Sequence, residues 1–431
     1  MVAPNGRRVA IVAGCRTPFA KSGTVLKDVS AVELARLATR ELLARTEIPP
    51  AEVDEVVFGQ VVPSVLAPNV AREVSLLPHL PRTVPAYSLN RACSSSAQTV
   101  AAAYDQIVLG HADVVIAGGT ESLSDVPILH SRRFAELLVE ASRARSLGKR
   151  LATFARVRLR DLVPVTPAIA EPSTGETMGQ SAEKMAKENH ISRDAQDRFA
   201  LRSHQRAAAG TADGRLTAEI VPVFVPPSYN VVVTSDNGIR ADTSLEQMAQ
   251  LKPAFDRRYG TVTAANASPL TDGASAVLVM SDEAAHGLGY TPLAYVRSYA
   301  VAAVDPGEQL LMGPGFAVPK ALGRAKIEWK DLDLVEMHEA FASQVLSNIQ
   351  AFESDQWARE RLGRSSRIGE VNWDTLNVMG GSIAIGHPFG ATGGRLTTTL
   401  ANEMVRRDAQ FGLISICAQG GMGFAMVLER M

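Results

Sequence analysis

The sequence has few cysteines, no excess of positive charge and no long apolar run. Cys15, Cys93 and Cys417 are its only cysteines, too few for a disulfide framework, and no C-x-x-C spacing suggests a zinc site. A net charge of −1 gives no reason to expect nucleic-acid binding. No apolar run reaches the roughly 18 residues that span a bilayer, and residues 9–13 are too short for a signal-peptide core. We therefore expect a cytoplasmic protein without a bound metal.

Apolar residues are 46% of the chain and charged residues 21%, a balance that suits a globular protein of two or three units. The first third alternates apolar runs, at 9–13, 53–58 and 114–117, with helical patterns at 31–45 and after Cys93. This rhythm predicts an α/β fold in which helices cover buried parallel strands.

The last third repeats the pattern of the first. A helix end, a short acidic link and a strand occur at 38–57 and again at 321–335. Strands followed by glycine turns occur at 114–119 and at 413–421. We interpret the chain as two copies of one α/β unit that bring equivalent strand ends to a shared cleft.

The middle of the chain lacks this rhythm. It is rich in proline and charge and contains a strong helical pattern over 181–209. Because 274–280 resembles the last strand of the second copy, the middle is predicted to interrupt the first copy. The predicted domains are 1–122 plus 257–283 for the first half, 123–256 for the insertion and 284–431 for the second half.

Cys93 directly precedes an alanine-rich helical pattern. Free N–H groups and the dipole at a helix N-terminus stabilise a thiolate, which is the nucleophilic form of cysteine. The alternative is a small buried apolar residue.

His387 lies in the glycine-rich segment 380–394. Such a segment allows close approach of the backbone to a ligand, but it matches neither common nucleotide-binding motif. A histidine here suits a base that keeps Cys93 ionised; a capping or core histidine is the alternative.

Two further side chains follow predicted strands. Cys417 ends the strand 413–416, where a second thiol could move protons between carbon and solvent or fill the core. His338 follows the strand 332–335 and could donate a hydrogen bond to a substrate oxygen or cap a turn. Cys15 is interpreted as structural. The remaining histidines are expected at the surface: His111, His130, His190, His204 and His286.

Five segments in this order together resemble the thiolases: the start of the helix at Cys93, residues 117–122, His-Glu-Ala-Phe at 338–341, the Gly-His-Pro loop and the terminal segment 417–423. The resemblance implies the thiolase fold, with two duplicated βαβαβαββ halves in a layered α-β-α-β-α arrangement and an inserted loop domain. It also implies a homodimer or a dimer of dimers.

The resemblance also implies roles for the residues. Cys93 would take the acyl group from a 3-oxoacyl-CoA, His387 would activate it, and Cys417 would exchange a proton with the acetyl-CoA enolate. The backbone N–H groups of Cys93 and Gln419 would form one oxyanion hole, and His387 with His338 a second. No tightly bound cofactor is implied, because coenzyme A and acyl-CoA are substrates.

For coenzyme A, the resemblance carries over to Met178, Phe255 and Ser268 along the pantetheine tunnel, with Phe341 at the acyl pocket; each could instead be ordinary packing. Most thiolases have asparagine at His338 and glycine at Ser96 and Gln419. The histidine form resembles the thiolase subunit of trifunctional β-oxidation complexes, which favours longer 3-oxoacyl chains and makes a hydratase/dehydrogenase subunit a candidate partner.

Residues 131–160 contain nine basic and two acidic residues, a local charge of +7, with apolar residues at helical spacing. Three interpretations remain open: a solvated basic face packed on the core, a patch that attracts coenzyme A phosphates, and a surface for peripheral membrane contact or partner docking.

The sequence thus favours a 3-ketoacyl-CoA thiolase of fatty-acid β-oxidation. An acetyl-CoA acetyltransferase that makes acetoacetyl-CoA by Claisen condensation has the same signature. The alternative from another class is an inactive thiolase-like carrier of lipid or acyl-CoA.

Overall fold

A computed structural model describes residues 6–78, 80–164 and 170–431. The elements of the first half are β1 (Val9–Arg16), β2 (Ala20–Lys21), α1 (Ala31–Thr46), β3 (Glu55–Gly59), α2 (Val70–Ser75), β4 (Ala86–Leu89), α3 (Ser95–Leu109), β5 (Val114–Glu121), β8 (Thr271–Ser281) and α9 (Asp282–Gly287). Those of the second half are β9 (Ala294–Ala303), α10 (Gly313–Ala325), β10 (Leu334–Met337), α11 (Ala342–Glu353), α12 (Asp355–Leu362), α13 (Ser382–Ile385), α14 (Thr392–Arg406), β11 (Phe411–Ala418) and β12 (Met422–Glu429).

The strand pairings confirm the duplication. The first half runs β4-β3-β5-β8-β1 and the second β10-β11-β12-β9. In both halves one parallel pair, β3 with β5 or β10 with β11, is followed by antiparallel pairs. The counterpart of β4 is reduced to a single bridge between Val335 and Leu376. The two halves are joined through β1 and β9.

The packing produces the five predicted layers. Helices α1 and α2 share a core cluster with one face of the first-half strands, and α10 and α11 share another with the second-half strands. Helices α3 and α14, one from each half, pack together between the sheets. They approach closely because Gly393 faces Ala97. A Cβ added at position 393 would lie 2.2 Å from the Ala97 nitrogen.

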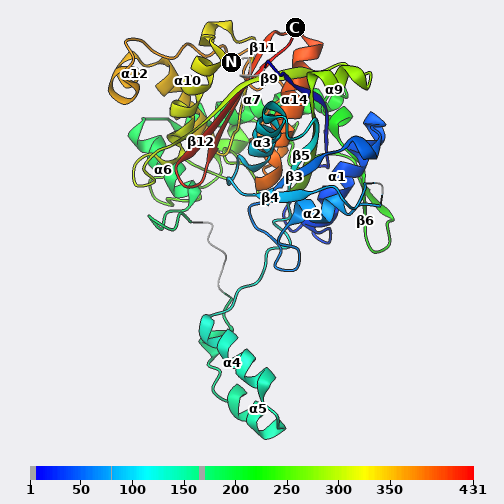
Figure 1. Cartoon of the computed structure of the whole chain (residues 1–431). Helices are drawn as coiled ribbons and strands as arrows, with labels where there is room; N and C mark the ends of the chain where they lie inside the picture. Colours follow the sequence, from blue (N-terminus) through cyan, green and yellow to red (C-terminus); the bar gives the residue numbers. More distant parts are fainter. Residues whose placement is uncertain (1–5, 79, 165–169) are drawn as a thin grey trace.

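The insertion contains α4 (Arg132–Arg143), α5 (Leu147–Phe154), α6 (Met178–Glu188), α7 (Arg193–Ala212), β6 (Val223–Val225), β7 (Val231–Val233) and α8 (Leu245–Ala249). Figure 1 shows α4 and α5 as a hairpin that projects away from the body of the molecule. The single helix predicted over 181–209 is wrong. The chain turns at His190, with φ 54°, and the Ser192 side chain caps a new helix by accepting from the Ala195 N–H.

Candidate active site

The structure brings Cys93, His338 and His387 together. Cys93 immediately precedes Ser94, the residue before α3, His338 follows β10, and His387 lies in the turn between α13 and α14. The Cys93 sulfur and one ring nitrogen of each histidine lie within 4.8 Å of one another. The two imidazole centroids are 4.1 Å apart. A cysteine with two histidines is also a set that zinc accepts, so the expectation of no metal stays a prediction.

The Cys93 side chain is half-buried. Burial raises the pKa of its thiol to about 11, although the backbone N–H groups of Gln419 and of Cys93 itself favour the thiolate. The two N–H groups predicted as an oxyanion hole are therefore the ones that act on the pKa of this thiol. The expectation that Cys93 rests as a thiolate is not supported, because desolvation outweighs these donors.

His387 is held as a neutral base. Its Nδ1 lies 2.6 Å from Thr392 Oγ1, and Thr392 Oγ1 donates to the Pro388 carbonyl at 3.3 Å. Burial lowers the pKa of His387 to about 3. Its Nε2 has no hydrogen-bond partner among the described residues. The turn is fixed to β5, because the Gly390 N–H donates to the Glu121 carboxylate at 3.0 Å.

His338 is buried beside His387, and its Nδ1 lies 2.9 Å from Ser382 Oγ. The neighbouring Glu339 has an anchoring role, since its carboxylate accepts from Ser203 at 2.6 Å and from Asn377 at 2.7 Å. Desolvation lowers the pKa of His338 well below its usual value, so its ring is neutral.

Cys417 lies at the end of β11, buried in a cluster that also contains Met178, Ala340 and Phe341. Burial, with a smaller contribution from the charge of Cys93, raises the pKa of its thiol well above the usual value. Cys15, by contrast, donates its S–H to the Ala38 carbonyl in the core. It is the structural cysteine that the sequence indicated.

A cavity of about 700 Å³ opens beside Cys93. Its wall is mainly apolar and includes Val61, Val62, Pro63, Leu123, Val126, Met178, Leu270, Phe389 and Met422. Met178, which the resemblance assigned to the pantetheine tunnel, thus borders the space next to the nucleophile. Phe341, expected at the acyl pocket, packs against Phe255 at a centroid distance of 6.0 Å.

Phe255 and Ser268 line a second cavity of about 400 Å³, together with Lys21, His204 and Arg240. The surface position expected for His204 is wrong: it is buried and accepts a hydrogen bond from the Arg240 N–H at 3.2 Å. Burial and the two cations lower the pKa of His204 to about 4. Its helical surroundings gave no signal of this, because the residues that cover it are distant in sequence.

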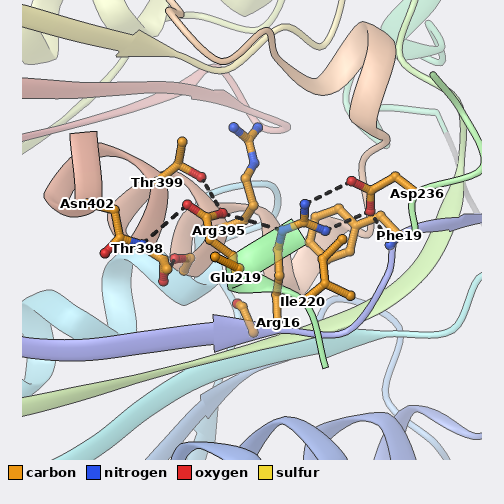
Figure 2. Close-up of polar contacts among 12 residues, drawn as sticks. Arg16, Phe19, Glu219, Ile220, Asp236, Arg395, Thr398, Thr399 and Asn402 are labelled. Carbon is orange, nitrogen blue, oxygen red and sulfur yellow. Dashed lines mark hydrogen bonds and ion pairs between the residues drawn. The ribbon is translucent and has the colours of Figure 1, made fainter. Parts of the chain in front are cut away.

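Buried ion pairs tie the insertion to both halves (Figure 2). Arg16 of β1 binds Asp236 through two hydrogen bonds of 2.7 and 2.8 Å. Glu219 lies 3.7 Å from Arg16 and accepts from Thr399 of α14 at 2.9 Å. None of these residues can be recognised from the sequence, since a single charged residue in a sequence does not reveal a buried partner.

Comparison with known proteins agrees with this architecture. Residues 9–283 match "Thiolase, N-terminal domain" and residues 290–430 match "Thiolase, C-terminal domain". A 3-ketoacyl-CoA thiolase of Yersinia enterocolitica is 50% identical over 100% of this chain and 98% of its own, and one of Shewanella pealeana is 50% identical over 98% and 97%. The crystal structure of human mitochondrial 3-ketoacyl-CoA thiolase in complex with CoA has a TM-score of 0.84 at 33% identity, over 99% of this chain and 98% of its own. The chain belongs to the thiolase family.

Proposed function

We propose that this chain is a 3-ketoacyl-CoA thiolase, which cleaves 3-oxoacyl-CoA with coenzyme A to acetyl-CoA and a shortened acyl-CoA. The observation that carries the proposal is the convergence of Cys93, His338 and His387 beside an apolar cavity. Relatives of that name, 50% identical over nearly the whole chain, support it.

In the first half-reaction, His387 Nε2 takes the thiol proton while the Cys93 sulfur attacks the C3 carbonyl of the substrate. The N–H groups of Cys93 and Gln419 stabilise the oxyanion, and one such donor typically contributes a factor of about 10²–10³ to kcat. The C2–C3 bond then breaks, and its electron pair forms the enolate of acetyl-CoA. His338 donates to the enolate oxygen, and Cys417 protonates C2.

In the second half-reaction, the thiol of coenzyme A attacks the acyl group on Cys93. Its proton goes to the Cys417 thiolate, which is a strong base because burial disfavours the ionised form. The Cys93 sulfur leaves and recovers its proton from His387. Both thiols and the imidazole return to their starting states, so no other acid or base is required.

The second cavity suits coenzyme A. Phe255 and Ser268 border it, as expected for the pantetheine arm, and Lys21 with Arg240 supplies positive charge for phosphate groups. A structural neighbour was solved in complex with CoA, which supports coenzyme A as a ligand of this chain.

Separate assays of acyl transfer and of carbon–carbon bond cleavage test the proposal. Exchange of labelled coenzyme A with an acyl-CoA needs only Cys93 and His387, because His387 can pass the Cys93 proton to the departing coenzyme A and take it back from the incoming one. Thiolysis also needs proton transfer to carbon, which leaves Cys417 as the thiolate. Cys93→Ala should lose both reactions, and Cys417→Ala should lose thiolysis while it keeps exchange. Cys15→Ala, at the structural cysteine, is the matched control and should keep both.

Equal loss of both reactions in Cys417→Ala would contradict the assigned role. Thiolysis of acetoacetyl-CoA alone would favour an acetyl-CoA acetyltransferase. Failure of the wild-type protein to form any acyl group on Cys93 would favour an inactive acyl-CoA carrier.

The hairpin α4–α5 supports a second proposal, peripheral contact with an anionic membrane surface. Leu147, Leu151 and Phe154 are 72%, 61% and 48% exposed, and basic residues surround them. The hairpin projects from the body, which disfavours a basic face packed on the core (Figure 1). None of residues 131–160 lines the cavities beside Cys93 or Ser268. In the described part of the chain, no helix has the length and hydropathy of a membrane span.

Flotation with vesicles tests this contact. The wild-type chain should float with vesicles that contain phosphatidylglycerol but less with phosphatidylcholine alone, because each basic residue near an anionic surface contributes about 1 kcal/mol. Arg143→Glu/Lys149→Glu should remain in solution, and Arg364→Glu/Arg367→Glu, on an exposed loop of the body, is the matched control. Equal flotation of both variants would reject the membrane proposal and leave a hydratase/dehydrogenase subunit as the candidate partner.

We further propose a cytoplasmic location with peripheral membrane association, and assembly as a homodimer or dimer of dimers. Sedimentation of the purified chain tests the assembly, and a monomer at micromolar concentration would contradict it.

A further inference from the structure

The two histidines of the site each contact a hydroxyl group through Nδ1, but the two hydroxyls differ in what else they bind. Thr392 Oγ1 donates its proton to the Pro388 carbonyl at 3.3 Å. This contact gives the hydroxyl proton an acceptor other than His387, so Thr392 Oγ1 can accept at 2.6 Å from a His387 that carries its proton on Nδ1. The Nε2 lone pair of His387 then faces the site, as a base requires.

Ser382 is in the opposite situation. Its Oγ accepts a hydrogen bond from Arg395 Nη2 at 3.1 Å, and a guanidinium group can only donate. Among the described residues, the one acceptor that the structure offers to the Ser382 proton is His338 Nδ1, 2.9 Å away. A neutral His338 must then carry its own proton on Nε2.

Arg395 is itself fixed in place. It is fully buried on α14, and its Nη1 lies 3.6 Å from the Glu336 carboxylate of β10. The same helix is held to the insertion through Thr399 and Glu219 (Figure 2). The ion pair with Glu336 thus holds the guanidinium beside Ser382.

We propose that Ser382, oriented by Arg395, is a positioning residue that holds His338 in the Nε2–H tautomer, opposite to that of His387. The two adjacent imidazoles then have different roles: His387 offers a lone pair to a thiol proton, and His338 offers an N–H to a developing oxyanion. This inference rests on the proposed thiolase chemistry for its consequence, but the tautomers themselves can be measured without turnover.

The direct test is nitrogen NMR of the intact chain labelled with ¹⁵N-histidine, with signals assigned by their loss in His338→Asn and His387→Asn. We expect the His338 signals of an unprotonated Nδ1 and a protonated Nε2, and the reverse for His387. A protonated Nδ1 on neutral His338 would overturn the proposal, whether or not the chain has thiolase activity.

The kinetic test compares thiolysis with coenzyme A exchange. Loss of one neutral hydrogen bond, about 0.5–1.5 kcal/mol, should lower the ratio of thiolysis to exchange by about two- to tenfold in Ser382→Ala. Ser382→Thr keeps a hydroxyl and should restore the ratio. Ser347→Ala removes a buried hydroxyl that has no partner among the described residues and is the matched control.

A double-mutant cycle separates positioning from a merely structural role. The amide of His338→Asn can donate without a choice of tautomer, so adding Ser382→Ala to it should leave the ratio unchanged. An equal fall of the ratio in both backgrounds would reject the positioning role. A wild-type chain without thiolysis would instead reject the proposed function and leave the tautomer assignment to the NMR result.

Discussion

The cavity beside Cys93 predicts how activity depends on the length of the acyl chain. Its apolar wall can bury methylene groups, each of which contributes about 0.8 kcal/mol when removed from water. That is about fourfold in kcat/KM per methylene. Between a four-carbon and an eight-carbon 3-oxoacyl-CoA, kcat/KM should therefore rise by about two hundredfold, measured as disappearance of the 3-oxoacyl thioester in the presence of coenzyme A.

Val62→Trp should abolish most of this increase. The Val62 N–H donates to the Glu121 carboxylate at 3.0 Å, so the backbone is fixed and the larger side chain must occupy the cavity. We expect a large loss for the eight-carbon substrate and little change for acetoacetyl-CoA. Val65→Trp, at a side chain 76% exposed in the same loop, is the matched control. A wild-type kcat/KM that is flat or falls with chain length would refute the assignment of this cavity to the acyl chain.

Three further changes probe the base, the buried ion pairs and the coenzyme A cavity. Because the pKa of His387 is lowered to about 3, its base form persists well below neutral pH, and coenzyme A exchange should be constant between roughly pH 5.5 and 8; a decrease with a midpoint near 6.5 would show a solvated base. Asp236→Asn removes the closer of the two carboxylates that face the buried Arg16 and leaves Glu219 at 3.7 Å, so it should lower the free energy of unfolding by less than the about 3–5 kcal/mol expected for a fully unpaired buried charge; an unchanged urea midpoint would contradict this cost. Gly179→Ala places a Cβ 2.1 Å from the Phe255 ring and should raise KM for coenzyme A several-fold at similar kcat; an unchanged KM would remove Phe255 from the coenzyme A contacts.

The features predicted from the sequence are those encoded locally. Apolar runs bounded by glycine turns define the strands, and the ends of those strands converge in any layered α/β arrangement. Cys93 and His387 could therefore be proposed as partners across about 300 positions of sequence. Their protonation could not be predicted, because the cost of burying a thiolate depends on what encloses it.

The features that were missed depend on long-range contacts. His204 lies on a helix with polar neighbours, yet Arg240 and Lys21 cover it in the folded chain. The break at His190 requires a left-handed residue where the local pattern favours a continuous helix. In the sequence, Ser382 is only a small residue in a glycine-rich segment. Its contacts with Arg395 and His338 depend on the fold.

The duplicated fold separates the chemistry of the two halves. The first half supplies Cys93 and the loop around Val62, whereas the second half supplies His338, His387 and Cys417. The acyl cavity can therefore change shape in the first half without moving the groups that transfer protons. The link between them is the Glu121 carboxylate, which accepts from the Val62 N–H and from the Gly390 N–H of the His387 turn, both at 3.0 Å. A single buried acceptor thus fixes the substrate loop relative to the base, and substitutions that spare it can alter chain-length preference without loss of the proton-transfer geometry.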